Sequence, residues 1–462
     1  MLFNDLHFLL FIVPIILLTI IFNRWGTVKQ RNMMLLFASY WFYGQFSWTY
    51  LISLAYVTLI NYFTVIYLHK KKQKVIVGIG VFLTLIPLFG YKYLYFLLTN
   101  VLMLSHTGWC HWILPVGISF FTFQALTYTV DFYRGKVAEV ANLLDYALFV
   151  AFFPTILSGP IERSRTLLPQ LKQLQRFNVA LFMNGFELFL WGLFKKVVIA
   201  DRINIYVTSL YAEPNIYSGN SYLLGIALYS IQIYCDFSGY SDMAIGVGRI
   251  LGFNLRKNFD YPYFSASIKS FWRKWHISLT SWFTEYLYIS CGGNRVPKWR
   301  WYVNISMVFL VSGIWHGAAW TFLIWGGLHA ILYLIEHVLK QDKKDYKGLD
   351  ACFSGLCVFA AVSLAWVFFR AESFNHAMQI IGSVGTGWGM WFKNGSSMSF
   401  AVMLMSVIVF SVMELICFKR IVKLTESEDN PYSWPNIMFV VFASLYTCLF
   451  GLSGTEFVYF QF

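Results

Sequence analysis

Long apolar stretches separated by short polar loops recur along the whole chain. They cover Leu6–Phe22, Met33–Phe46, Leu51–Leu68, Val75–Tyr91, Leu181–Leu193, Tyr222–Tyr234, Val303–Val311, Phe353–Phe369, Phe400–Phe418 and Ile437–Leu452. A helix needs about 20 apolar residues to cross a bilayer, so the shorter stretches are expected to tilt, to join a neighbour or to enter and return. The pattern predicts an all-α polytopic membrane protein with about 10–13 helices at membrane depth and no separate soluble domain.

The composition agrees with this pattern, because 58% of the 462 residues are hydrophobic and only 12% are charged. An average soluble domain is about 25% charged. The net charge of +13 comes from short loops, which is the positive-inside distribution and not a nucleic-acid footprint. Basic residues in Arg24–Arg31, Lys70–Lys74 and Lys419–Lys423 predict cytoplasmic loops, and the uncharged Gly44–Thr49 is predicted outside. Both termini are then outside, and Leu6–Phe22 is a first anchor, not a cleavable signal.

The middle of the chain breaks the apolar pattern, because Ser158–Arg202 and Asp236–Arg300 mix polar residues with apolar ones. Such residues at membrane depth are costly and indicate a water-filled cavity or a function. We expect Asn254–Trp275 to be an amphipathic segment that lies on the inner surface. Its cations either anchor it to anionic lipid or bind a charged ligand; they are Arg256, Lys257, Lys269, Arg273 and Lys274.

His316 stands in the apolar run Ser312–Trp320, among small residues. Gly313 and Gly317 are four residues apart, so on a helix they share one face, where another backbone or a substrate can come close. A neutral imidazole in such a place is either a satisfied structural group or a general base that takes a proton from a hydroxyl. The residues predicted to wall an apolar tunnel beside it are Trp315 and Trp320.

A second histidine, His276, follows Trp272–Trp275 where the basic segment is expected to re-enter the membrane. The alternative for it is an interfacial belt of aromatic and basic residues. His329 is expected to be structural, since it lies about 220° around a helix from His316. The sequence contains no G-x-S-x-G elbow, no P-loop and no CxxC pair, so we predict no serine triad, no metal site and no disulfide framework.

Three of the longer motifs are Asp236–Ala244, Phe271–Leu279 and Ser312–Trp320; further ones are Leu114–Gln124, Phe153–Pro154 with Ser158–Ile161, Gly192–Lys196 and Trp366–Arg370. Together they closely resemble the membrane-bound O-acyltransferase superfamily, in the branch of the alginate O-acetyltransferase membrane subunits. The resemblance covers nearly the whole chain. It implies a single integral membrane domain over residues 1–462, with a ring of tilted and re-entrant helices around a central funnel. It also implies that His316 is the essential catalytic histidine and His276 the second family histidine.

The function that the resemblance implies is O-acyl transfer in a bacterial plasma (inner) membrane. Acetyl groups from cytoplasmic acetyl-CoA would cross the membrane for O-acetylation of a polysaccharide outside, with a secreted SGNH-type acetyltransferase as partner and no bound cofactor. The residues leave the polymer open among an alginate-like exopolysaccharide, peptidoglycan and cellulose. The alternatives are D-alanyl transfer to teichoic acid, and a non-enzymatic transporter or scaffold, although the paired halves common in transporters are absent from the sequence.

The last residues, Phe457–Phe462, fit an F-x-Y-x-x-F ending that follows a final span. In the related D-alanylation system this ending belongs to a separate membrane peptide, so the resemblance implies that Tyr459 carries the acyl group; an aromatic belt is the alternative. His316 would remove the phenol proton, since tyrosine has a pKa near 10. The predicted donor- or substrate-binding residues are Arg256, Lys257, Arg273, Lys274, Trp315, Trp320, Asp236 and Asn304, and the candidate oxyanion donors are Asn304, Ser312 and Trp320.

Overall fold

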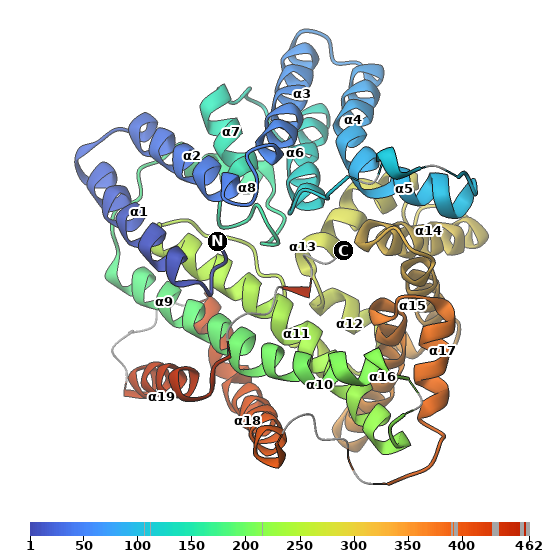
Figure 1. Ribbon diagram of the computed structural model, residues 1–462. Helices are drawn as coiled ribbons and strands as arrows, with labels where there is room; N and C mark the ends of the chain where they lie inside the picture. Colours follow the sequence, from blue (N-terminus) through green and yellow to red (C-terminus); the bar gives the residue numbers. More distant parts are fainter. Residues whose placement is uncertain are drawn as a thin grey trace. The chain divides into compact units, whose positions relative to one another are not determined.

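The computed structural model describes residues 1–105, 107–110, 112–214, 216–389, 391, 396–426, 434–452 and 457–458, with the backbone alone at 343, 416–426 and 435. Within these ranges every regular element is a helix (Figure 1), which confirms the all-α class. Six helices in the same ranges are long and apolar enough to cross a membrane: Leu6–Trp25, Tyr50–Lys70, Lys74–Val101, Trp320–Val338, Gly348–Arg370 and Ser397–Leu415. The protein is therefore a multi-pass membrane protein.

The chain divides into two compact units. The first consists of Met1–Trp191, Tyr240–Arg256 and Ser427–Val440, and the second of Gly192–Gly239, Lys257–Glu426 and Val441–Phe462. The boundaries fall inside three helices, which are α9 (Val179–Phe194), α11 (Gly219–Ile250) and α19 (Trp434–Phe450). That the chain forms a single membrane domain stays a prediction.

The first unit has a buried polar interior. Arg31 of α2 is fully buried and donates to the carbonyl oxygens of Leu171 and Gln173 at 2.6 and 2.5 Å, and Asn32 donates to Asp145 at 2.7 Å. Arg31 is therefore not the exposed loop cation that its sequence position suggests. The helices that lie wholly in this unit are α1 (Leu6–Trp25), α2 (Val28–Gly44), α3 (Tyr50–Lys70), α4 (Lys74–Leu88), α5 (Leu94–Phe96), α6 (Ile118–Tyr133), α7 (Leu143–Ala151) and α8 (Ser164–Leu171).

The second unit is built around an antiparallel pair, α14 (Lys298–His316) and α15 (Trp320–Val338), whose backbones approach closely. A Cβ atom at Gly313 would meet the carbonyl oxygen of Phe322, and one at Gly326 would meet that of Phe309. Only glycine permits this approach. The other helices wholly in this unit are α10 (Asp201–Ala212), α12 (Ile268–Lys274), α13 (Ile277–Trp282), α16 (Gly348–Arg370), α17 (Phe374–Ser383) and α18 (Ser397–Glu426).

Several helices contain π-helical turns, a feature that often accompanies functional sites. Two of these turns lie in the second unit. The segment η4 continues α9, and the segment η6 continues α13. The π-helical segments are η1 (Phe89–Tyr93), η2 (Leu97–Val101), η4 (Lys195–Ala200) and η6 (Phe283–Tyr288).

The stretch Asn254–Trp275, predicted as an amphipathic segment on the inner surface, is not one continuous helix. Its regular parts are a single 3-10 turn at Pro262–Phe264 and the two-turn helix α12. Tyr261 has left-handed backbone angles (φ +48°) and a proline follows it, so a continuous helix cannot form there. Phe271 is fully buried, so at least this apolar side chain faces protein and not lipid.

Candidate active site

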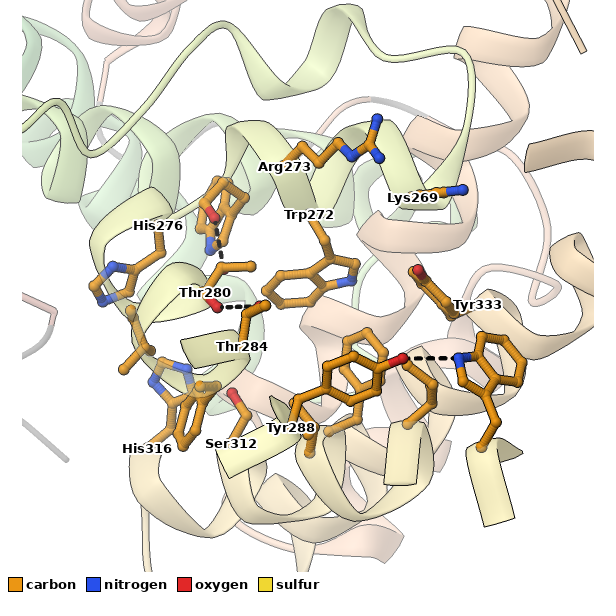
Figure 2. A pocket seen from close by; sticks show the side chains of 17 residues that line it. Lys269, Trp272, Arg273, His276, Thr280, Thr284, Tyr288, Ser312, His316 and Tyr333 are labelled. Atoms are coloured by element: carbon orange, nitrogen blue, oxygen red, sulfur yellow. Dashed lines mark hydrogen bonds between the residues drawn. The ribbon is translucent and has the colours of Figure 1, made fainter. Parts of the chain in front are cut away.

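The second unit contains a cavity of about 250 Å³, lined by residues of α12, α13, α14, α15 and η6. Figure 2 shows His276 and His316 on one side of it, with the hydroxyl residues Thr280 and Ser312 beside them, and Lys269 on the other side. Much of the wall in between is aromatic. An apolar cavity with a few polar groups at chosen points is the common form of a small-molecule site.

His316 is the last residue of α14 and is only 4% exposed. Its ring packs edge-on against Trp315, Trp325 and Phe369, with centroid distances of 4.9, 5.1 and 5.2 Å. A histidine held in this way can act as a general base when its imidazole is neutral. The cage of three rings also fixes the direction of the imidazole.

His316 does not lie deep inside a helix as the sequence suggests. The helix ends there because Gly317 is extended (φ −162°, ψ 153°), and Ala319 is extended as well. Gly313 and Gly317 consequently do not form one helix face, and Gly313 packs against α15 instead. The break allows α15 to turn back, and it places His316 at the head of the hairpin.

His276 is the residue directly before α13 and has left-handed backbone angles (φ +43°, ψ 54°), which L side chains rarely adopt. Its Nδ1 lies 3.2 Å from Oδ1 of Asn258, and the backbone N–H of Ser278 donates to the same oxygen at 3.2 Å. Because an amide oxygen only accepts, Nδ1 carries the proton and Nε2 keeps its lone pair. Asn258 thus sets the tautomer of a histidine that is 1% exposed.

The two histidines, forty positions apart in the sequence (316 − 276), line the same cavity. Trp315 packs against both, with ring centroids 6.1 Å from His276 and 4.9 Å from His316. The tryptophan that the sequence predicts as a tunnel wall therefore fixes the two rings against a common surface. Two imidazoles beside one cavity suit proton transfer during acyl transfer.

Two cationic residues of α12 line the cavity, Lys269 and the exposed Arg273. Glu336 holds the start of α12, since its carboxylate accepts the backbone N–H groups of Ile268 and Lys269. The Lys269 Nζ atom forms an ion pair with Asp342 at 2.9 Å. Burial raises the pKa of the Asp342 carboxyl, but the hydrogen bond and charge of Lys269 outweigh this and hold the pKa below its usual value. Asp342 therefore stays ionised at neutral pH and keeps Lys269 in place.

Residues 33–370 match the family described as MBOAT, membrane-bound O-acyltransferase. The match covers more than half of the chain and includes both histidines of the cavity. The chain belongs to the membrane-bound O-acyltransferase family.

Individual relatives narrow the comparison within this family. The chain is 37% identical over 367 residues to the probable alginate O-acetylase AlgI of Pseudomonas putida, which covers 77% of this chain and 75% of the relative. It is 36% identical over 391 residues to the peptidoglycan O-acetyltransferase of Helicobacter pylori, with 77% and 74% covered. The teichoic acid D-alanyltransferase of Bacillus subtilis is 31% identical over 278 residues, with 56% and 70% covered. The chain is therefore an O-acyltransferase, and the O-acetyltransferases are its nearer relatives among these.

The basic residues predicted to bind the donor of this O-acyltransferase occupy different surroundings. Arg273 lines the cavity. Lys257 forms an ion pair with Asp260 at 2.7 Å, and the carbonyl oxygen of Lys274 accepts the backbone N–H of that same aspartate. Arg256 belongs to the first unit, where its backbone N–H donates to Glu162 at 2.6 Å. A donor-binding role for these last three cations stays a prediction.

Of the other predicted site residues, some line the cavity and others have different surroundings. Ser312 lines the cavity, whereas the Asn304 side chain donates to the carbonyl oxygens of Cys291 and Gly293 at 3.2 and 3.4 Å. Trp320 is half exposed at the start of α15, so its predicted role as a tunnel wall stays a prediction. Asp236 is buried in an ion pair with Lys196, and Tyr459 lies outside the described residues.

Sequence reasoning missed several polar residues of the site. Lys269 carried one signal, because it stands in the same basic run as Arg273. The hydroxyl groups, which nothing in the sequence distinguished, are those of Thr280, Thr284, Tyr288 and Tyr333.

As for metals, no three His, Cys, Asp or Glu side chains come together in the part of the chain that the structure describes.

Proposed function

We propose that this O-acyltransferase moves acetyl groups from acetyl-CoA to a polysaccharide outside the cell. The named activities of its nearer relatives, alginate O-acetylation and peptidoglycan O-acetylation, support acetyl as the group and a polysaccharide as the final acceptor. The observation that carries the proposal is the arrangement of the cavity, with two histidines on one side and cations on the other. A thioester donor fits this arrangement, because its anionic head can bind the cations while its acyl end lies beside the histidines.

In this proposal the donor lies along the cavity. Lys269 and Arg273 bind the phosphates of coenzyme A through charge-assisted hydrogen bonds. The aromatic wall packs on the apolar part of the thioester arm, and the acetyl carbonyl lies beside His276 and His316. Arg273 is exposed and reaches a phosphate from outside, whereas the ion pair with Asp342 fixes Lys269 nearer the cavity.

In this proposal acyl transfer takes place beside the two histidines of the cavity. His316 takes the proton of an attacking hydroxyl while the oxygen forms a bond to the thioester carbonyl carbon. The Ser312 hydroxyl donates to the oxyanion of the tetrahedral intermediate. The carbon–sulfur bond then breaks, and the imidazolium returns the proton to the leaving thiolate. The products are an acetyl ester and free coenzyme A, with no net change in protons.

The first hydroxyl in the proposal is the phenol of Tyr459, which follows directly after Val458 in the chain. A separate SGNH-type acetyltransferase outside the membrane takes the acetyl group from the tyrosine and passes it to the polymer. This order requires both chain termini outside a plasma membrane. It agrees with the four lysines at the end of α3, in the loop that follows and at the start of α4, which the positive-inside rule places in the cytoplasm. If a reporter that works only in the cytoplasm were active when fused after Phe462, this orientation would be wrong.

The test is to incubate purified protein with acetyl-labelled acetyl-CoA and to measure intact mass and peptide masses. We expect label on the C-terminal peptide of the wild type and none in Tyr459→Phe, which removes only the hydroxyl. Coenzyme A release without label on any peptide would exclude the tyrosine relay and leave direct transfer to the acceptor. No coenzyme A release at all, with label appearing from a D-alanyl carrier thioester instead, would favour the D-alanyl alternative. Inactivity with both donors would favour a transporter or scaffold.

A further inference from the structure

Three buried charges form a cluster in the second unit, away from the residues that line the cavity. Lys196 of η4 has its Nζ 2.7 Å from Asp236 of α11 and 2.9 Å from Asp201 at the start of α10. The three side chains are 1–2% exposed. Burying charges is costly even when they are paired, and a hydrophobic replacement is often as stable. A cluster of this kind therefore calls for an explanation beyond stability.

The described part of the C-terminal tail, Phe457–Val458, lies on this cluster. The backbone N–H of Val458 donates to the second carboxylate oxygen of Asp236, Oδ2, at 2.7 Å, while Oδ1 binds Lys196. Lys196 Nζ also lies 4.2 Å from the centre of the Phe457 ring. Phe457 is 1% and Val458 7% exposed. The ion pair thus orients a carboxylate toward a backbone donor of the tail and a cation toward its aromatic ring.

A second attachment holds the chain just before the tail. The backbone N–H of Leu452 donates to the carbonyl oxygen of Val197 at 2.9 Å, and Arg202 Nε donates to that of Phe450 at 2.9 Å. Val197 adjoins Lys196 in η4, and Arg202 adjoins Asp201 in α10. The chain is therefore bound by η4 and α10 just before residues 453–456, and by Lys196 of η4 and Asp236 of α11 just after them.

The cluster also adjoins a catalytic histidine through the next residue of α11. Phe237 follows Asp236, and its ring centroid lies 4.6 Å from that of His276. Asn258 holds the same histidine through Nδ1. Two neighbouring residues of α11 thus contact the tail and the histidine: Asp236 binds Val458, and Phe237 packs on the His276 ring.

We propose that Lys196 and Asp236 are positioning residues that dock the protein's own C-terminal tail, so that the residue after Val458 is delivered to the histidine end of the cavity. This inference rests on the proposed function, because it gives the docked tail the role of acyl acceptor. It assigns Asp236 to the tail and not to the donor. Asp201 pairs with the same lysine at 2.9 Å and fixes it in place.

The test compares Asp236→Asn with Asp350→Asn, which removes the carboxylate of an exposed ion pair with Lys344. Hydrogen–deuterium exchange of the peptide that contains Val458 measures docking, and label from acetyl-CoA on the C-terminal peptide measures delivery. We expect Asp236→Asn to speed exchange of that amide about tenfold or more, since a hydrogen bond to a charged acceptor is lost. Labelling should slow by a similar factor. Asp350→Asn should stay near wild type in both measurements.

A second pair of variants leaves the cluster itself intact, in case the buried substitutions prevent folding. Phe457→Leu removes the ring that faces Lys196 and should speed exchange and slow labelling, whereas Phe353→Leu, which removes an exposed ring of α16, should do neither. Unchanged exchange in both Asp236→Asn and Phe457→Leu would overturn the docking. Faster exchange with undiminished labelling would overturn the positioning role. Exchange as expected in a wild type that never takes label would refute the acyl-acceptor role of the tail while the docking stands.

Discussion

Replacing His316 separates its proposed chemistry from its packing. His316→Ala would remove three edge-on ring contacts, with Trp315, Trp325 and Phe369. Each such contact contributes about 0.5–1.5 kcal/mol beyond area burial, so the loss of stability is on the order of 2–4 kcal/mol. An inactive alanine variant would therefore prove little. His316→Phe keeps an aromatic ring of similar size in the cage and removes both nitrogens.

For His316→Phe we expect acetyl transfer to fall by about 10²- to 10⁴-fold, the usual effect of losing a general base. The thermal unfolding midpoint in detergent should stay close to that of the wild type, because the ring contacts persist. The assay follows coenzyme A release with a thiol reagent, and the label on the C-terminal peptide. Measuring unfolding on the same preparations separates inactivity from misfolding.

His329→Phe is the matched control. His329 is fully buried in α15, and its ring lies 4.9 Å from those of both Trp272 and Trp325, yet it is not among the residues that line the cavity. This variant should keep activity within a few-fold of the wild type, as expected for a change in packing alone. If His316→Phe retained most of its activity, or if both variants lost it equally, the assignment of His316 as the base would be wrong.

Three further predictions follow from single contacts. Lys269→Ala should raise KM for acetyl-CoA about tenfold with kcat little changed, since a charge-assisted bond to the donor is lost; an unaltered KM would remove this residue from the donor site. Asn258→Ala frees the tautomer of His276 and should lower kcat roughly five- to tenfold, given that a hydrogen bond is worth about 1 kcal/mol. It should also lower the unfolding midpoint, because the buried N–H of Ser278 loses its acceptor; normal kcat would argue against a role for that histidine. Gly313→Ala places a Cβ against a backbone oxygen and should destabilise the protein by about 1–3 kcal/mol, whereas at Gly327 the nearest atom is 3.9 Å away and alanine should be tolerated. Equal unfolding midpoints for the two alanine variants would contradict the close approach of α14 and α15.

The membrane class was predictable because it depends on composition and on the length of apolar stretches. The predicted stretches Leu6–Phe22 and Leu51–Leu68 correspond to α1 and α3, which begin within one residue of the predicted starts. The importance of the run around His316 was also visible, since small residues and tryptophans around a lone histidine are unusual. These signals are local, and local patterns are what a sequence displays most directly.

The remaining features depend on tertiary contacts. No residue near His316 predicts that α14 ends there, because the extended backbone of Gly317 depends on how α15 packs back against α14. The left-handed residues Tyr261 and His276 break a segment whose composition favours an amphipathic helix. The partner of Lys196 is Asp236, forty residues away, and other carboxylates were equally plausible from the sequence. Residue types are therefore visible before the structure, but their partners are not.

The buried cluster also has a consequence for how the protein is made. Lys195, Lys196 and Asp201 come directly after the apolar helix α9, and a charged side chain at the centre of a bilayer costs about 2.5–3.5 kcal/mol on insertion scales. Asp201 can pair with only one of the two lysines, and the second carboxylate beside Lys196, Asp236 of α11, leaves the ribosome only after some forty more residues. During synthesis the end of α9 therefore has no favourable place in lipid on its own. We expect it to remain beside the insertion machinery until α11 emerges, so that the two helices enter the membrane as one unit.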